Sequence, residues 1–355
     1  MILSYIMPVY NGEKYLSDAI ESILNQPNNK WELIIINDGS KDSSLDIINN
    51  YSNKYDSIKV INQENHGVDY ARNRGVDIAQ GKYIIFIDQD DIVLENSFND
   101  DLCATLESNY DENVDVIGFK FIQSNDNLTK YNIENSRIQS MGLDSYNKKR
   151  CYMIAPLPIH VNFFSSRLFK SKGLRFNEKY RLCDTDNQFC HNLFYHADNI
   201  LINNNISFYC WRSNRGSTSH SNKKYIARYI EHINCWCDLY DEHLEDGDIN
   251  AANYCLAFAY GAFYYMAKGV YMHFGANKIW NETIPKLKLR NKIHEYAMCE
   301  NVETINGLDK LFNHRLIFSV EMKLYRIILF IRKYLVKIAL VNKILDKRKF
   351  VYTKN

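Results

Sequence analysis

Apolar and polar positions alternate in blocks along the first 120 residues of the chain. Short runs that are apolar at every position predict buried strands, and apolar residues three or four apart predict helices that pack on one face. The predicted strands are 2–9, 33–36, 58–61 and 83–87, and the predicted helices are 13–26, a segment capped by Asp42 or Ser43, and 67–80. Strands of this kind, separated by helices, predict an α/β domain with a mostly parallel sheet flanked by helices.

Three of the predicted strands run directly into polar tips. These tips are Tyr10-Asn11, Asn37-Asp38 and Asp88-Gln89-Asp90-Asp91. In a parallel sheet flanked by helices, ligands bind beyond the carboxyl ends of the strands. We therefore expect the three tips to meet at one edge of the sheet and to form a single site.

The remainder of the chain is less regular. Residues 125–150 are polar and predict a connecting loop, 151–212 continue the pattern of strands and helices, and 220–310 are mainly helical with many aromatic residues. The predicted organisation is an α/β domain over residues 1–220, a helical C-terminal region over 221–320 and a basic amphipathic tail helix over 321–355.

Composition limits the classes of function. Of the 355 residues, 46% are hydrophobic and 24% are charged, which is typical of a packed globular protein. The net charge of +1 gives no overall field that would attract nucleic acid. The nine cysteines form no CxxC pair, and the N-terminus has no pattern of a signal peptide. These features predict a reducing compartment, and therefore the cytoplasm.

The run Asp88-Gln89-Asp90-Asp91, which we call the acidic tip, is the clearest candidate for a metal site. Carboxylates this close resist ionisation together unless a cation lies among them. Hard oxygen ligands suit Mg²⁺ or Mn²⁺, held by one or two carboxylates and by the phosphates of a substrate. The alternative is a solvated loop whose aspartates cap the next helix. A calcium loop is excluded, because neither its glycine nor its terminal glutamate is present at the required spacing.

Three further positions each allow two interpretations. Asp38 lies in an ordinary turn sequence, but its position beside the acidic tip would let it accept a hydrogen bond from a pyrimidine N–H. Arg72 and Arg74 suit a diphosphate, although an exposed helix face explains each of them as well. Asp184 precedes an apolar helix and is either its N-cap or a general base.

Taken together, the motifs resemble a known family. The sequence contains, in order, Pro8-Val9-Tyr10-Asn11, Asn37-Asp38-Gly39-Ser40, Asn65-His66-Gly67 with Ala71-Arg72-Asn73, and Gly81-Lys82-Tyr83-Ile84 leading into Asp88-Gln89-Asp90-Asp91. This order resembles the family 2 glycosyltransferases of the GT-A fold. The resemblance covers residues 1–110, and it continues more weakly to about 220 through Phe176-Asn177-Glu178 and Tyr209-Cys210-Trp211-Arg212.

The resemblance implies a nucleotide-binding role for four residues. Tyr10 would stack on the base, usually uracil, and Asp38 would bond the edge of the base. Arg72 would help to hold the nucleotide, and Asp88 would reach the ribose. The donor would then be a nucleotide-sugar, with UDP as the expected nucleotide.

The resemblance also implies a metal site at the same tip. Asp90 would bind the divalent metal, Mn²⁺ or Mg²⁺, that bridges the diphosphate, with Asp88 and Asp91 as further ligands. His220 lies where some relatives place a residue near the diphosphate.

The general base of the family is the aspartate of a Glu-Asp pair. Asp184 falls at that position, but Cys183 replaces the glutamate, so Asp186 is an alternative base. One base without a covalent nucleophile implies inversion at the anomeric carbon.

The expected function is transfer of a sugar from a nucleotide-sugar to a glycan or lipid-linked glycan in surface-polysaccharide assembly. Two other interpretations stay open. A strand that ends in Asp-x-Asp also occurs in phosphatases of the haloacid-dehalogenase type, but there it is the first strand, whereas here it is the fourth. A non-catalytic nucleotide- or glycan-binding protein on a decayed transferase fold is the other, and Cys183 supports it.

The segment 322–349 is basic and amphipathic. Apolar residues fall on one helical face, basic residues lie away from it, and Asp346 is the one acid. The charges recur too often for a transmembrane helix. Such a helix either lies on an anionic membrane surface or packs on its own domain.

Overall fold

The structure is a computed structural model. It describes residues 1–125, 131–133, 145–147, 159–180, 185–213 and 225–252, together with 254–256, 258–259 and 262. The chain divides into two compact units, residues 1–254 and 255–355. Helix α7 (Tyr225–Glu245) therefore groups with the sheet of the first unit, whereas the sequence assigned it to a separate helical region. The predicted boundaries at 220 and 320 stay predictions.

The first half of the sheet forms where the sequence predicts it. Runs of buried apolar residues become strands, and the intervening amphipathic segments become helices: β1 (Leu3–Val9), α1 (Leu16–Leu24), β2 (Trp31–Asp38), α2 (Ser44–Ser52), β3 (Ile58–Gln63), α3 (Val68–Ile78) and β4 (Tyr83–Phe86). The alternation of strand and helix over this part of the chain is confirmed.

The second half contains shorter and more irregular elements. In chain order they are β5 (Ile92–Val93), α4 (Asp100–Asp111), β6 (Val116–Asn125), β7 (Tyr131–Ile133), β8 (Ser145–Asn147), a 3-10 turn η3 (Ile159–Val161), β9 (Asn162–Ser165), α5 (Ser166–Lys170), α6 (Asp186–His196) and β10 (Asn199–Ser213). Strands β7 and β8 lie in the segment that the sequence predicted as loop. They form because they pair with the longer strands β6 and β10.

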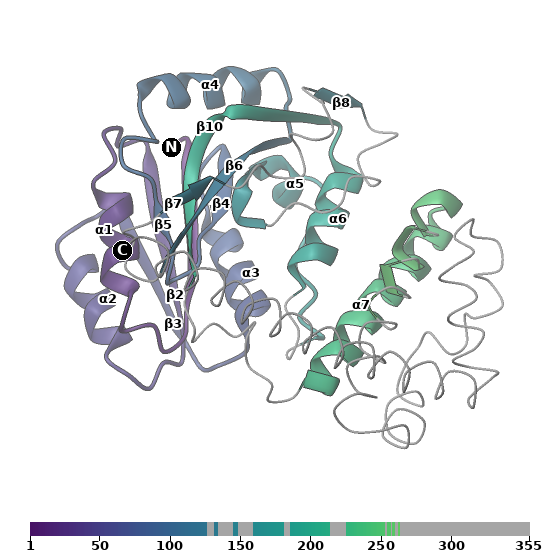
Figure 1. Cartoon of the computed structure of the whole chain (residues 1–355), viewed down its shortest axis with the longest axis horizontal. Helices are drawn as coiled ribbons and strands as arrows, with labels where there is room; N and C mark the ends of the chain where they lie inside the picture. The colour runs from purple at the N-terminus through teal and green to yellow at the C-terminus, as the bar shows by residue number, and fades with distance from the viewer. Residues whose placement is uncertain are drawn as a thin grey trace, which may run out of the picture. The chain divides into compact units, whose positions relative to one another are not determined.

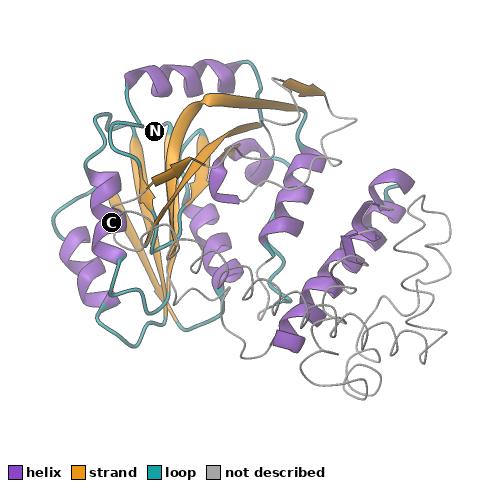
Figure 2. Ribbon diagram, in the orientation of Figure 1, coloured by secondary structure: helices purple, strands orange, loops and turns teal. Residues whose placement is uncertain are grey.

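The strands form one mixed sheet in the order β3-β2-β1-β4-β9-β6-β10-β5 (Figures 1 and 2). Strands β1 to β4 are parallel to one another, and β9 runs antiparallel between β4 and β6. The chain leaves β1 toward β2 and β3 and then crosses back to β4 on the other side. The carboxyl ends of β1 and β4 therefore flank a switch point, where sheets of this kind bind ligands.

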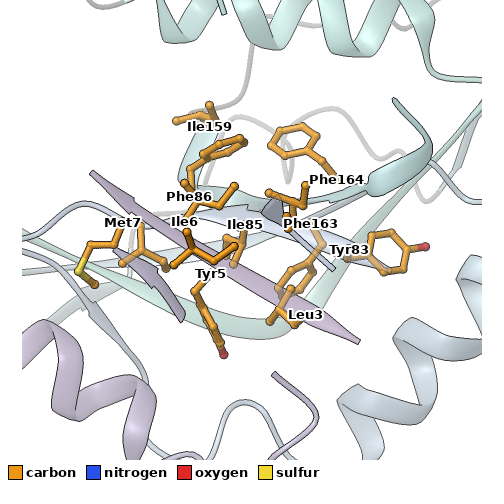
Figure 3. Packing of buried hydrophobic residues seen from close by; sticks show 14 of the residues in the cluster. Leu3, Tyr5, Ile6, Met7, Tyr83, Ile85, Phe86, Ile159, Phe163 and Phe164 are labelled. Carbon is orange, nitrogen blue, oxygen red and sulfur yellow. The ribbon is translucent and has the colours of Figure 1, made fainter. Parts of the chain in front are cut away.

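Helices cover both faces of the parallel half, with α1 and α2 on one side and α3 on the other (Figure 1). Helix α3 packs closely on β1 and β2 because Gly75 has no side chain. A Cβ atom there would lie 2.5 Å from Ile6 and 2.9 Å from Ile36. On the same sheet, Ile6 and Phe86 pack with Phe163 and Phe164 (Figure 3). This core fixes the carboxyl ends of the central strands.

The basic segment 322–349 lies outside the described residues, so its two interpretations stay predictions. Among the helices that the structure does describe, none combines the length and the apolar character that crossing a membrane requires.

Candidate functional site

The parallel register brings the three polar tips to one edge of the sheet. Val9 pairs with Asn37, and Asp38 pairs with Gln63, while Ile6 pairs with Phe86 two positions before Asp88. Because the strands are parallel and in this register, their carboxyl ends lie at the same edge of the sheet, and the three tips are brought together there.

Tyr10 is the exposed aromatic side chain of this edge, with 47% of its surface accessible. Its backbone is held by the side chain of Gln89. The Tyr10 N–H donates to Gln89 Oε1 at 2.9 Å, and Gln89 Nε2 donates to the Tyr10 carbonyl at 3.1 Å. A Cβ atom on Gly12 would lie 2.4 Å from the same Oε1. No role for Gln89 was predicted from the sequence, yet its side chain joins the tip of β1 to the acidic tip.

Asp38 is buried and holds the loop that leads into α3. Its Oδ1 accepts from Gln63 Nε2 and from the His66 N–H, both at 2.8 Å, and its Oδ2 accepts from the Gly67 N–H at 2.9 Å. A carboxylate offers about four acceptor positions. Three bonds therefore leave capacity for one more donor, and the predicted contact with a base stays a prediction.

Arg72 is buried in α3 and is surrounded by carboxylates from three elements. Its guanidinium pairs with Asp186 at the start of α6, and lies 3.5 Å from Asp88 and 3.5 Å from Asp69. It also lies 5.3 Å from the centre of the Phe176 ring. The sequence treated Arg72 and Asp186 as separate candidates, and the structure brings them together beside Asp88. Arg74, by contrast, is half exposed and near Asp77.

The three aspartates of the acidic tip differ in their surroundings. Asp88 and Asp90 are partly exposed, while Asp91 is 1% exposed. Asp91 accepts hydrogen bonds from the Tyr209 hydroxyl and, at 2.7 Å, from the Arg212 N–H. Burial, followed by the charges of Asp88 and Asp90, raises the pKa of Asp91 well above its usual value. In this structure both Asp91 oxygens thus bind the protein, so we interpret Asp91 as a structural residue.

Arg212, on strand β10, also contacts the acidic tip. Its Nε donates to the Asp90 carbonyl at 2.8 Å, and its guanidinium pairs with Asp18 at 2.9 Å. The same group lies 4.5 Å from the centre of the Tyr15 ring. The motif Tyr209-Cys210-Trp211-Arg212 was recognised in the sequence, but the contact between Arg212 and Asp90 was not predicted. Arg212 positions the backbone of Asp90.

Asn73, next to Arg72, holds the segment before α6. Its Nδ2 donates to the Phe176 carbonyl at 3.0 Å and to Glu178 Oε1 at 2.7 Å, and its Oδ1 accepts from the Phe176 N–H at 2.9 Å. These contacts link the motif Ala71-Arg72-Asn73 to the motif Phe176-Asn177-Glu178. Asp184, Cys183 and His220 lie outside the described residues, so their roles stay predictions.

We expect Asn73→Asp to lower the melting temperature by about 3–6 °C, because two donated bonds are lost and a carboxylate faces Glu178. Scanning calorimetry measures the change. The double variant with Glu178→Gln restores a donor opposite the new carboxylate and is expected to recover part of the loss. An unchanged melting temperature in Asn73→Asp would contradict this account.

The strand order, the switch point and the acidic tip define a GT-A fold, the class to which nucleotide-sugar transferases belong. Crystal structures of S. aureus TarS agree with this. The complex of TarS residues 1–349 with UDP-GlcNAc matches with a TM-score of 0.66 at 19% identity, over 91% of this chain and 89% of that chain. At this identity the likeness shows the fold, and it confirms the fold class predicted from the sequence.

Residues 4–175 match the family model for glycosyl transferase family 2, and this part of the chain belongs to that family. An uncharacterized glycosyltransferase of Escherichia coli, YibD, is 38% identical over 109 residues, which are 31% of this chain and 32% of YibD. Another of Bacillus subtilis, EpsJ, is 28% identical over 241 residues, which are 64% of this chain and 68% of EpsJ.

A third relative is named for its substrate. The poly(ribitol-phosphate) beta-glucosyltransferase of Bacillus spizizenii is 41% identical over 97 residues, which are 26% of this chain and 15% of that protein. The matches to YibD and to this enzyme span a third or less of those proteins. They therefore identify a family 2 glycosyltransferase domain at the start of the chain. The acidic tip lies within this domain, so its Asp-x-Asp motif no longer supports a phosphatase.

Proposed function

We propose that the protein transfers a sugar from a UDP-sugar to the hydroxyl group of a glycan or lipid-linked glycan, with inversion. The observation that carries the proposal is the meeting of Tyr10, Asp38 and Asp88 at the switch point of a family 2 domain. The UDP-GlcNAc complex of TarS supports a UDP-linked donor. One relative is named for minor teichoic acid biosynthesis and another as a poly(ribitol-phosphate) beta-glucosyltransferase, and these names support a surface glycan as the acceptor class.

The exposed Tyr10 ring offers a face on which a base can stack. Asp38, whose carboxylate is fixed by the loop before α3, would accept the additional N–H of uracil. Asp88 would bond the ribose, and its contact with the guanidinium of Arg72 orients it. The nucleoside is thus recognised by groups that the fold already holds in place, which reduces the entropy lost on binding.

The acidic tip fits a divalent cation. Two partly exposed carboxylates, Asp88 and Asp90, lie beside the buried Asp91, and their mutual repulsion contributes to the raised pKa of Asp91. Hard oxygen donors of this kind suit Mg²⁺ or Mn²⁺. Asp90 and Asp88 would hold the cation, which when bound would stabilise the negative charge of the leaving diphosphate. The pairing of Asp91 with Tyr209 and Arg212 supports two ligands rather than three.

The chemistry requires one general base. The acceptor oxygen forms a bond to the anomeric carbon, the bond from that carbon to the diphosphate oxygen breaks, and the acceptor proton passes to the base. Asp184 is the proposed base and Asp186 is the alternative. Asp186 is ion-paired with Arg72 through Oδ1 in the structure, which leaves it less available to an acceptor hydroxyl group and so favours Asp184. The setting we propose is the cytoplasmic side of a membrane, with the basic segment 322–349 on its surface.

Calorimetric titration of the purified protein tests the donor site. In the presence of Mn²⁺ we expect the protein to bind UDP more tightly than GDP. We expect Asp38→Ala to lower the affinity for UDP by about ten-fold or more, since a charge-assisted hydrogen bond is lost. Asp56→Ala, at an exposed turn before β3 and away from the edge, is the control. If neither nucleotide binds with or without the metal, the donor site is wrong and the interpretation as a decayed fold gains support.

A further inference from the structure

A cavity of about 170 Å³ lies between helices α6 and α7, outside the donor site. One water requires about 15 Å³ measured in the same way, so the space is that of a sugar ring rather than of a solvent molecule. Its wall comes from the segment before α6, from the first turns of α6 and from α7. All of its residues belong to the first compact unit.

The lining of the cavity combines an apolar floor with a polar rim. Phe189 and Leu239 are buried in the floor, while Asn177, Asn192 and Glu242 are at least partly exposed around it. The rim thus offers amide donors and acceptors and one carboxylate. Hydroxyl groups bind to such side chains, and the C–H face of a sugar packs on apolar ones.

Gln188 is a buried polar residue of the lining. It is 2% exposed, its Nε2 lies 3.0 Å from the ring Nδ1 of His232, and the same Nε2 donates to the His232 carbonyl at 3.2 Å. Its Oε1 accepts no hydrogen bond from the described residues. A buried acceptor without a partner destabilises the protein. A sugar hydroxyl group that reaches this oxygen would satisfy it.

The cavity adjoins the predicted chemistry. Thr185 lines it and donates through Oγ1 to Asp69 at 2.6 Å, and Asp69 lies 3.5 Å from Arg72. Arg72 in turn contacts Asp88 of the acidic tip. Asp184, the proposed base, immediately precedes Thr185 in the sequence. A group bound in the cavity is therefore connected to the acidic tip through Thr185, Asp69 and Arg72.

We propose that this cavity binds one neutral hexose unit of the acceptor glycan and so helps to select the acceptor. The inference rests on the proposed function, because it needs a donor at the acidic tip. The charged residues of the lining are Glu242 and Arg175, and the Arg175 guanidinium is already paired with Asp77 at 3.0 Å. A lining whose one cation is already paired fits a neutral sugar better than a phosphorylated alditol.

Saturation-transfer NMR on the full chain with UDP and Mg²⁺ tests the proposal. The probes are the α- and β-methyl glycosides of glucose, galactose and N-acetylglucosamine. We expect at least one to bind the wild-type protein. Asn192→Phe, which fills the cavity, is expected to weaken that binding by about ten-fold or more, and Asn192→Ala is expected to weaken it less. Asn187→Ala, an exposed position on the same helix, is the matched control and is expected to bind as the wild type does.

Two results would overturn the cavity assignment. One is a wild-type protein that binds UDP but none of the glycosides. The other is unchanged glycoside binding in Asn192→Phe with UDP binding intact. If Asn192→Phe does not fold, Asn192→Ala and Glu242→Gln decide the matter by the same measurement. Failure of the wild-type protein to bind UDP would instead overturn the proposed function, so the two failures are distinguishable.

Discussion

Asp90→Ala is expected to reduce sugar transfer roughly a thousand-fold, because the variant lacks the carboxylate proposed to hold the cation beside the leaving diphosphate. The fold is expected to persist, since Asp90 is partly exposed and its backbone carbonyl still accepts from Arg212. Turnover of UDP-sugars, measured as UDP release, gives the rate. Calorimetry with Mn²⁺ gives the metal affinity independently of activity.

Glu95→Ala is the matched control for this experiment. Glu95 is an exposed carboxylate in the turn after β5, five positions further along the chain. Its removal changes the net charge by the same amount without touching the site, and full activity is expected. If Asp90→Ala keeps both wild-type turnover and wild-type response to Mn²⁺, the proposed metal site is wrong.

Asp91→Ala is expected to lower the melting temperature by about 5–10 °C. The substitution leaves the buried Tyr209 hydroxyl and the Arg212 N–H without their shared acceptor, and each such loss costs about 1–3 kcal/mol. Asp91→Asn is expected to be close to the wild type or more stable. An amide oxygen can accept from Arg212, an amide nitrogen can donate to the Tyr209 oxygen, and no charge is buried.

The difference in stability between Asp91→Asn and the wild type is expected to depend on pH. Since the pKa of Asp91 is raised in the folded state, folding is favoured while the group stays protonated. Stability from this group is present below its unfolded pKa and is lost as the pH rises through the folded value. The advantage of Asp91→Asn over the wild type should therefore grow as the pH rises from acid toward neutral. A constant difference between pH 4 and pH 8 would contradict a raised pKa.

The parallel half of the sheet could be predicted from the sequence because its signals are local. Most residues of strands β1 and β2 are apolar and all of them are buried, and the turns that follow these strands contain Gly and Asn. The edge at which the site forms then follows from the rule for parallel strands. Strand β9 gave no comparable signal, since its four residues take their place through pairing with β4 and β6.

The chemistry of the acidic tip was predictable as a group but not residue by residue. Asp90 and Asp91 are adjacent and chemically identical, and the sequence offers no means of telling them apart. What distinguishes them is Tyr209, which is 118 positions away and donates to Asp91. The role of Gln89 was hidden in the same way, because its partner at Tyr10 is 79 positions away. Contacts between distant segments decide which polar residues are structural.

The position of β9 between β4 and β6 has a consequence for how the protein can be divided. Residues 4–175 carry the family match, and a much shorter part of the chain already contains β1 to β4 and the acidic tip. A fragment that ends before residue 162 would leave the apolar edge of β4 without its neighbour. An open, apolar strand in mid-sheet invites pairing with another chain. The acidic tip can therefore be used as a separate module only together with strand β9, which begins about seventy residues further along the chain.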